Sequence, residues 1–159
     1  MKFLTADLCD EHHERVKVAD SIFTLYGQKR AFYGRIHTVK VFEDNVLVKQ
    51  ALETIPKESV LVVDGGGSKK CALVGDNLAE IAISRQLAGM IVYGCIRDCA
   101  QINKMNIGIY ALGTNPLKSI KQGKGIENVP VQFAGINFEP GSYLYADEDG
   151  IIVAREQLV

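Results

Sequence analysis

The clearest hydrophobic pattern lies in the middle third of the chain. Residues 60–63 read Val-Leu-Val-Val, an unbroken apolar run rich in β-branched side chains, which predicts a strand buried on both faces. A helix is expected from about Asn77 to Ala88, with Gly89 as the residue that ends it. A second apolar run, residues 90–93, predicts another buried strand. This order and spacing indicate a βαβ unit with parallel strands and a right-handed crossover.

Weaker patterns flank this unit on both sides. Thr5 is expected to cap a short helix carrying residues 7–14, and Asn45 to cap a helix that runs through Thr54 and stops at Pro56. Further strands are expected at 31–42, 107–112, 129–138, 143–145 and 151–153, with a tight hairpin turn at 149–150. The predicted fold class is α/β with mixed sheets, in one domain spanning residues 1–159.

Composition and charge narrow the class of protein. The chain has 159 residues, 47% hydrophobic and 23% charged, which is ordinary for a globular protein. Eighteen basic residues against nineteen acidic ones offer no basic footprint for nucleic acid or an anionic membrane. The apolar stretch 90–96 is too short to cross a bilayer, and residues 1–4 open no signal peptide. We therefore expect a soluble cytoplasmic protein with no membrane or direct nucleic-acid partner.

The four cysteines suit a reducing compartment. Cys9, Cys71, Cys95 and Cys99 form no CxxC pair, which favours reduced, partly buried thiols over a metal or redox site. Cys9 with the histidines at positions 12 and 13 is a loose ligand-like group, and a polar helix face explains it better than a zinc site.

Two familiar motifs are absent around the glycine-rich loop 64–70. A dinucleotide fingerprint starting at Gly65 would need glycine or alanine where Lys70 stands, and a P-loop would need glycine in place of Ser68. The loop is therefore either a sharp turn or the rim of a nearby pocket. No GxSxG motif accompanies the histidines, so a nucleophilic triad is disfavoured.

Matching lengths single out Asp76, Arg97 and Asp98. The predicted helix rises about 18 Å at ~1.5 Å per residue. The strand that follows returns over about 20 Å at ~3.3 Å per residue. Arg97 and Asp98 should therefore arrive beside the start of the helix, the segment Gly75-Asp76-Asn77-Leu78. Ligands usually bind at this carboxyl edge of parallel strands in α/β sheets.

The chemistry of this corner can be stated from the residue types. The free amides of Asn77 and Leu78 can hold a small carboxylate, and Arg97 can bind a carboxylate or stabilise a developing negative oxygen. Asp98 is a hard oxygen ligand for Mg²⁺ or Mn²⁺, and Asp76 can orient or deprotonate a water or a hydroxyl. The alternative is structural: Asp76 would be a helix cap, and Arg97 with Asp98 a surface ion pair.

The same residues resemble a known family. Asp76, twenty intervening residues and then Arg97-Asp98 match the Asp-x20-Arg-Asp signature of the RraA-like (HMG/CHA aldolase) family. Further likeness lies in the segments at 7–10, 38–40, 42–45, 62–68 and 145–152, so the resemblance spans nearly the whole chain and is closest to RraA, the regulator of ribonuclease E.

The resemblance implies a swivelling β/β/α-type fold, a homotrimer with active sites at subunit interfaces, and a class II aldolase that uses Mg²⁺ or Mn²⁺. Its substrate would be the 2-oxo acid 4-hydroxy-4-methyl-2-oxoglutarate, cleaved to two pyruvates, with oxaloacetate decarboxylation as a second activity. Carried over by position, the amides of Gly75 to Leu78 would bind the substrate carboxylate, and Arg97 the keto oxygen. Asp98 would hold the metal, and Asp76 would position the basic water.

Three alternatives to this activity stay open. A Schiff-base lysine could replace the metal, but Lys49, Lys69 and Lys70 are not expected within the corner. The RraA likeness implies a regulator that binds ribonuclease E without chemistry, although Asp98, present here, favours a retained lyase. A small-acid binding protein without turnover is the third.

Overall fold

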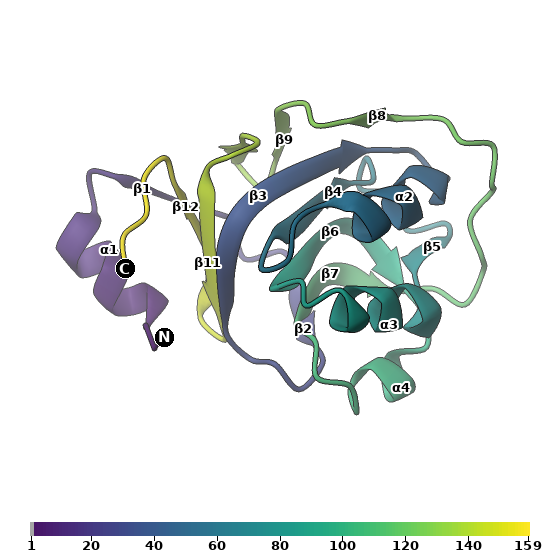
Figure 1. The fold of residues 1–159 in the computed structure, drawn as a ribbon, viewed down its shortest axis with the longest axis horizontal. Helices are drawn as coiled ribbons and strands as arrows, with labels where there is room; N and C mark the ends of the chain where they lie inside the picture. The colour runs from purple at the N-terminus through teal and green to yellow at the C-terminus, as the bar shows by residue number, and fades with distance from the viewer. Residues whose placement is uncertain (1) are drawn as a thin grey trace.

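A curled, mixed β-sheet organises the chain, which a computed structural model describes over residues 2–159 (Figure 1). The helices are α1 Thr5–His12, α2 Val46–Thr54, α3 Asp76–Ser84 and α4 Cys99–Ile102. The strands are β1 Val16–Val18, β2 Thr24–Tyr26, β3 Phe32–Lys40, β4 Val60–Asp64, β5 Ala72–Val74, β6 Gly89–Ile96, β7 Ile109–Thr114, β8 Ile126–Glu127, β9 Val131–Phe133, β10 Ile136–Phe138, β11 Tyr143–Asp147 and β12 Gly150–Ala154.

Four parallel strands, in the order β3-β4-β6-β7, form the centre of the sheet. Strands β4 and β6 are neighbours and pair in parallel, with α3 between them in the chain, so the βαβ unit predicted from the sequence is confirmed. β2 and β11 add antiparallel strands at the two sides, and β12 and β1 continue the sheet beyond β11. The α/β class with mixed strands is therefore as expected.

Three apolar clusters hold these elements together. The first lies between the central strands and helices α2 and α3, which cover one face of the sheet (Figure 1). The second packs the opposite face against β9, β10 and the β11–β12 hairpin. The third fixes α1, at the left of Figure 1, against β11 and β12 through Leu8, Tyr145 and Ile152. Since the central strands are covered on both faces, the all-apolar runs in the sequence are explained.

Helix α3 ends earlier than the sequence suggests. Its last residue is Ser84, and Gln86 adopts a positive φ of 58° in the turn that follows. Gly89 does not stop the helix; it is the first residue of β6, where an added Cβ would overlap the ring of Phe32. Close packing against the Phe32 ring of β3 therefore explains this glycine, and the prediction that it is a helix stop is wrong.

Both predicted helix caps are replaced by other contacts. Thr5 is the first residue of α1, and its hydroxyl donates a 2.6 Å hydrogen bond to Asp147 on β11 instead of capping the helix. Asn45 does occupy the N-cap of α2, but the carboxylate of Asp44 accepts the N–H of Val46 at 3.1 Å. The predicted end of α2 at Thr54, before Pro56, is confirmed.

The C-terminal strands follow the predicted outline with shifted turns. The range 129–138 is a hairpin of two strands, β9 and β10, rather than one strand. Asp147 pairs with Gly150, so the last tight turn is Glu148-Asp149, one residue earlier than expected. The short elements β1, β2, β5, β8 and α4 carry too few residues to show a periodic pattern. No helix within residues 2–159 is long and apolar enough to cross a membrane.

Candidate active site

The carboxyl edge of the parallel strands brings the predicted corner together. Arg97 and Asp98 directly follow β6, and Gly75 directly precedes α3. A Cβ built on Gly75 would lie 2.7 Å from Asp98 Oδ2 and 3.6 Å from Arg97 Nε. The backbone N–H of Arg97 donates to the carbonyl of Val74 at 2.9 Å, which holds the end of β6 against the entrance to α3. The two residues therefore lie beside the first residues of the helix.

Asp98 is fixed by its backbone and by a hydrogen bond. Its φ of 59° and ψ of 36° lie in the left-handed region, at the N-cap of α4. Its Oδ2 atom accepts the backbone N–H of Asp76 at 3.0 Å. That bond, aided by the positive charge of Arg97 and opposed by burial, holds the pKa of the Asp98 carboxyl below its ordinary value. The carboxylate is therefore ionised at neutral pH, as a metal ligand must be.

The structural alternative for these residues does not hold. Gly75, not Asp76, occupies the N-cap of α3, so the Asp76 side chain is not the helix cap. Among residues 2–159, the ion pairs within 4.0 Å do not include Arg97. Its guanidinium instead donates a long, 3.4 Å bond to the carbonyl of Pro116. The half-buried Arg97 thus keeps most of its donors available to a ligand.

A cavity of about 280 Å³ opens at this corner. The segment Gly75–Leu78, Arg97 and Asp98 form one part of its wall. Asn45, at the N-cap of α2, and Lys49 of α2 form another. The loop between β7 and β8 supplies Lys118, Ser119 and Lys121, which sequence reasoning did not find. The sequence does show two lysines close to a serine, a combination that can bind an anion. Nothing in the local sequence pattern, however, places that loop beside α3.

The residues that line the cavity include a lysine that was not expected there. Lys49 lines the cavity, although no lysine was expected within the corner. Its side chain is exposed at the surface of α2, whereas desolvation in an apolar pocket is one way in which nucleophilic amines are activated. Exposure disfavours a Schiff-base mechanism at this residue.

The donor set fits a hard divalent cation. Two carboxylates, Asp76 and Asp98, line the cavity, and Mg²⁺ commonly binds through one or two carboxylates while keeping several waters. No group of three or more His, Cys, Asp or Glu side chains placed to hold a metal occurs within residues 2–159, and structural zinc needs four such ligands. The site therefore suits Mg²⁺ or Mn²⁺ better than zinc.

The cysteines take no part in this corner. All four are free thiols, and burial is the largest effect that raises the pKa values of Cys9, Cys71 and Cys95. A raised pKa keeps a thiol protonated and unreactive at neutral pH. The expectation of reduced, structural cysteines agrees with these environments.

The glycine-rich loop is a turn. Gly66 and Gly67 have φ values of 68° and 73°, which side-chain-bearing residues rarely adopt. The carboxylate of Asp64 accepts the N–H of Gly66 at 2.9 Å, and a Cβ on Gly67 would lie 3.0 Å from the ring of Tyr93. Of the two interpretations of this loop, tight turning accounts for the glycines.

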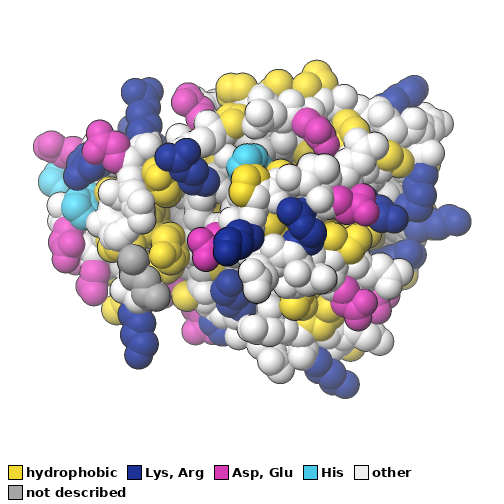
Figure 2. Space-filling view, in the orientation of Figure 1, with side chains coloured by type: hydrophobic (Ala, Val, Ile, Leu, Met, Phe, Trp, Pro, Cys, Tyr) yellow, Lys and Arg dark blue, Asp and Glu magenta, His cyan; other side chains and the backbone are white. Residues whose placement is uncertain are grey.

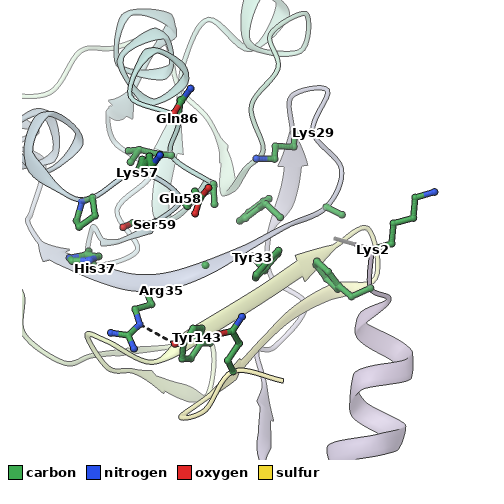
Figure 3. A pocket seen from close by; sticks show the side chains of 18 of the residues that line it. Lys2, Lys29, Tyr33, Arg35, His37, Lys57, Glu58, Ser59, Gln86 and Tyr143 are labelled. Atoms are coloured by element: carbon green, nitrogen blue, oxygen red, sulfur yellow. Dashed lines mark hydrogen bonds between the residues drawn. The ribbon is translucent and has the colours of Figure 1, made fainter. Parts of the chain in front are cut away.

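A larger cavity, of about 990 Å³, lies at the opposite edge of the sheet (Figure 3). Its wall is formed where β3, β4 and β6 begin, and it carries Lys29, Arg35, His37 and Lys57. Burial, followed by the charge of Arg35, lowers the pKa of His37, and Arg35 donates to the hydroxyl of Tyr143 at 3.1 Å. Ligands of α/β sheets bind at the carboxyl edge, so the smaller cavity is the candidate active site.

Comparisons with known proteins place the whole chain in a family. A family model described as RraA-like (Aldolase/RraA) matches residues 5–153. A relative from Aromatoleum aromaticum, named "Putative 4-hydroxy-4-methyl-2-oxoglutarate aldolase", is 55% identical over 159 residues and 100% of each chain. An Arabidopsis thaliana relative of that name, numbered 3, is 49% identical and covers 98% of this chain and 97% of its own.

Two solved structures share the fold closely. A Geobacillus kaustophilus protein, named S-adenosylmethionine:2-dimethylmenaquinone methyltransferase, superposes with a TM-score of 0.97 at 55% identity, covering 98% of this chain and 97% of that one. The RNA-processing inhibitor RraA from Thermus thermophilis gives a TM-score of 0.95 at 42% identity, with coverage of 100% and 96%.

The fold is a mixed α/β sheet with a cavity lined by charged side chains at the carboxyl edge of its parallel strands. The chain belongs to the RraA-like family, and both the family and the fold class expected from the sequence are confirmed.

Proposed function

We propose that the protein is a lyase dependent on Mg²⁺ or Mn²⁺. It would cleave 4-hydroxy-4-methyl-2-oxoglutarate to two pyruvates and also decarboxylate oxaloacetate. The observation that carries the proposal is the meeting of Arg97 and Asp98 with the first amides of α3 in one cavity. The names of the Aromatoleum and Arabidopsis relatives support the same reaction.

The start of α3 would bind the substrate carboxylate. The first N–H groups of a helix have no partner within it, and the helix dipole favours an anion there. The N–H of Asp76 is already donated to Asp98, so within the first turn of α3 the amides of Asn77 and Leu78 remain for the substrate. This removes the Asp76 amide from the predicted binding segment.

Arg97, Asp76 and Asp98 would share the chemistry. The bond between C3 and C4 of the substrate breaks, and its electron pair stays on the C3 fragment as a pyruvate enolate. Arg97 stabilises the negative oxygen of that enolate, and Asp76 positions the water that removes the proton of the 4-hydroxyl. The enolate then takes up a proton to give pyruvate. With oxaloacetate the leaving fragment is carbon dioxide.

Asp98 would hold the divalent cation, aided by Asp76. Once bound, the cation would act as a Lewis acid on the 2-oxo acid. The fixed left-handed backbone of Asp98 and its bond to the Asp76 amide orient the carboxylate before any cation arrives. That preorganisation is what outer contacts of metal ligands ordinarily provide.

A methyl-transfer reaction, suggested by the name of the Geobacillus protein, fits this corner less well. Drug-sized ligands occupy pockets of about 300–1,000 Å³. The cavity here is about 280 Å³ and lined by charged side chains, which suits a small carboxylic acid better than a nucleoside-sized methyl donor.

Arg97→Ala tests the proposal. Release of pyruvate from 4-hydroxy-4-methyl-2-oxoglutarate with added Mg²⁺ should fall on the order of 10²–10³-fold in kcat, the usual loss of an oxyanion-stabilising group. Arg155→Ala removes an exposed arginine from a separate hollow and should retain the activity. Full turnover by the Arg97 variant, or by the unaltered protein in excess EDTA, would rule out the proposal.

We also infer a cytoplasmic homotrimer with shared active sites. Four large apolar side chains lie exposed in segments that run beside one another next to the cavity: Phe42, Leu117, Ile120 and Ile126. Exposed apolar clusters mark contact surfaces. Light scattering should give three times the chain mass, and Leu117→Glu with Ile120→Glu should yield smaller species.

The second candidate function is binding to ribonuclease E without chemistry. It is favoured by the structural likeness to the Thermus protein, which is named as an RNA-processing inhibitor. Purified ribonuclease E that is neither retained by the immobilised protein nor slowed by it would remove this candidate. The two functions do not exclude each other.

A further inference from the structure

The cavity wall contains a buried hydroxyl with nothing to bind. Ser119 is 4% exposed and lines the cavity, yet its Oγ atom has no hydrogen-bond partner. Among residues 2–159 it is the single buried side-chain polar atom in that condition. Buried polar atoms are almost always satisfied, so an orphan at a cavity wall points to a partner supplied by a ligand.

The backbone around Ser119 is held on both sides. The N–H of Ala72 donates to the carbonyl of Leu117 at 2.8 Å, and the N–H of Ile120 donates to the carbonyl of Glu43 at 2.9 Å. The segment is thereby fixed between β5 and the entrance to α2. These bonds fix the backbone on either side of Ser119, and none of them involves its hydroxyl.

The carboxylate of Asp44 fixes the turn that follows. Asp44 is 4% exposed and accepts the N–H groups of Gln122 and Lys124 at 3.0 and 3.1 Å. Lys121, immediately before this turn, donates from Nζ to the Asn45 side chain at 2.8 Å. Lys121 is therefore aligned on the same wall as Ser119.

The net charge of the side chains that line the cavity indicates the charge of its ligand. Four cations line the cavity against two carboxylates, an excess of two positive charges: Arg97, Lys49, Lys118 and Lys121 against Asp76 and Asp98. No ion pair within 4.0 Å joins any of these four to a carboxylate in the described chain. Figure 2 shows Lys and Arg side chains gathered at the right-hand edge, where the loop between β7 and β8 runs in Figure 1.

We propose that Ser119, with Lys121 beside it, binds the second carboxylate of a 2-oxo dicarboxylic acid. This inference rests on the proposed function, because the first carboxylate is taken to lie on the amides of Asn77 and Leu78. An excess of positive side chains on this wall suits a ligand with more than one carboxylate, and two of the lysines, Lys118 and Lys121, stand on the loop beside Ser119. A monocarboxylic 2-oxo acid such as pyruvate would leave the Ser119 hydroxyl unbound.

Calorimetry with two unreactive probes in the presence of Mg²⁺ tests the proposal without turnover. The probes are 2-oxoglutarate, a dicarboxylate without the 4-hydroxyl that cleavage needs, and pyruvate. Ser119→Ala should weaken binding of 2-oxoglutarate about tenfold and leave that of pyruvate unchanged, as expected for one hydrogen bond to a charged group. Ser119→Thr retains a hydroxyl and should restore binding. Ser142→Ala, in a separate hollow, is the matched control.

The stability of the ligand-free protein separates a binding role from a structural one. Because Ser119 makes no hydrogen bond within the chain, Ser119→Ala should leave the urea midpoint unchanged or raise it. A marked fall in that midpoint would assign the residue to the fold. Should Ser119→Thr be too large for the wall, Lys121→Met offers a second variant, with the same selective loss of 2-oxoglutarate binding.

Each outcome has a distinct meaning. Equal effects of Ser119→Ala on both probes, or no effect on either, would overturn the subsite. Failure of the unaltered protein to bind 2-oxoglutarate would also overturn the subsite. The protein could also bind 2-oxoglutarate selectively through Ser119 and yet cleave no 2-oxo acid. That result would support the proposed subsite and rule out the proposed lyase activity.

Discussion

Asp98 accepts the backbone N–H of Asp76 at 3.0 Å, although 22 positions separate the two residues. The bond joins the end of β6 to the first turn of α3, and it takes up an amide that would otherwise bind an anion. It also leaves the carboxylate of Asp98 oriented and ionised at neutral pH. Under the proposed function, this one contact would determine which amides of α3 bind the substrate and where a cation is held.

Gly75→Ala should disturb that contact without unfolding the protein. The new methyl group would lie 2.7 Å from Asp98 Oδ2, so the carboxylate has to move. Loss of a ligand-orienting contact typically lowers metal affinity or activity about 10- to 100-fold. Titration with Mn²⁺ and a pyruvate-release assay measure the two effects. Gly113→Ala is the control, since a Cβ there meets nothing within 4 Å, and equal losses in both variants would contradict the prediction.

Asp44→Asn should destabilise the protein and alter its acid sensitivity. Burial acts to raise the pKa of Asp44, but backbone N–H bonds from residues such as Val46 and Lys124 hold the pKa below its ordinary value. Its stabilisation is therefore present above the unfolded pKa and is lost as pH falls through the lower, folded pKa. We expect a loss of about 1–3 kcal/mol at neutral pH, because the amide presents its NH₂ group to backbone donors.

Urea unfolding at neutral pH and under acid conditions checks this expectation. The difference in stability between Asp44→Asn and the unaltered protein should shrink as the carboxylate of the latter becomes protonated. A difference that is constant with pH would show that the charge of Asp44 is not what stabilises the turn.

Arg85→Met should loosen the end of α2. The guanidinium of Arg85, just after α3, donates to the carbonyls of Leu52 and Ile55 at 2.6 and 2.8 Å. These carbonyls lie at the end of α2, where helical partners are lacking. We expect a loss of about 1–3 kcal/mol in the free energy of unfolding. Arg85→Lys should recover only part of it, because an ammonium group lacks the planar fork that reaches two acceptors. Complete recovery would argue against the two-acceptor geometry.

Tyr110 should be the last tyrosine to titrate. Burial, followed by the charge of Asp147, raises the pKa of Tyr110 to about 12, and its hydroxyl donates to the carbonyl of Asp147. A raised folded pKa means that its stabilisation is complete below the unfolded pKa of about 10 and is lost as pH rises through the folded value. Phenolate absorbance should show one late step among six tyrosines, absent in Tyr110→Phe. Persistence of that step in the variant would assign it to another residue.

The sequence was sufficient for the centre of the fold and for the position of the corner. The apolar runs 60–63 and 90–93 predicted neighbouring parallel strands, because only strands covered on both faces are apolar at every position. The comparable lengths of the helix and the returning strand placed Arg97 beside α3, and the structure brings them together. The lengths matched even though α3 ends at Ser84, since a turn spans the remaining distance to β6.

The part of the cavity wall formed by the loop between β7 and β8 could not be predicted from the sequence pattern. Ser119 and Lys121 sit in a loop with no repeating pattern of apolar residues. The position of that loop depends on hydrogen bonds to Glu43, Asp44 and Ala72, which lie as many as 80 residues away in the chain.

Sequence periodicity records which face of a strand or helix is buried, and that determined the sheet, its crossover and the residues at its carboxyl edge. Backbone hydrogen bonds between distant loops leave no such record, because any residue except proline offers the same donor and acceptor. The tertiary structure alone therefore decided that Asp98 takes the Asp76 amide, and that Ser119 lines the same cavity while its hydroxyl has no hydrogen-bond partner.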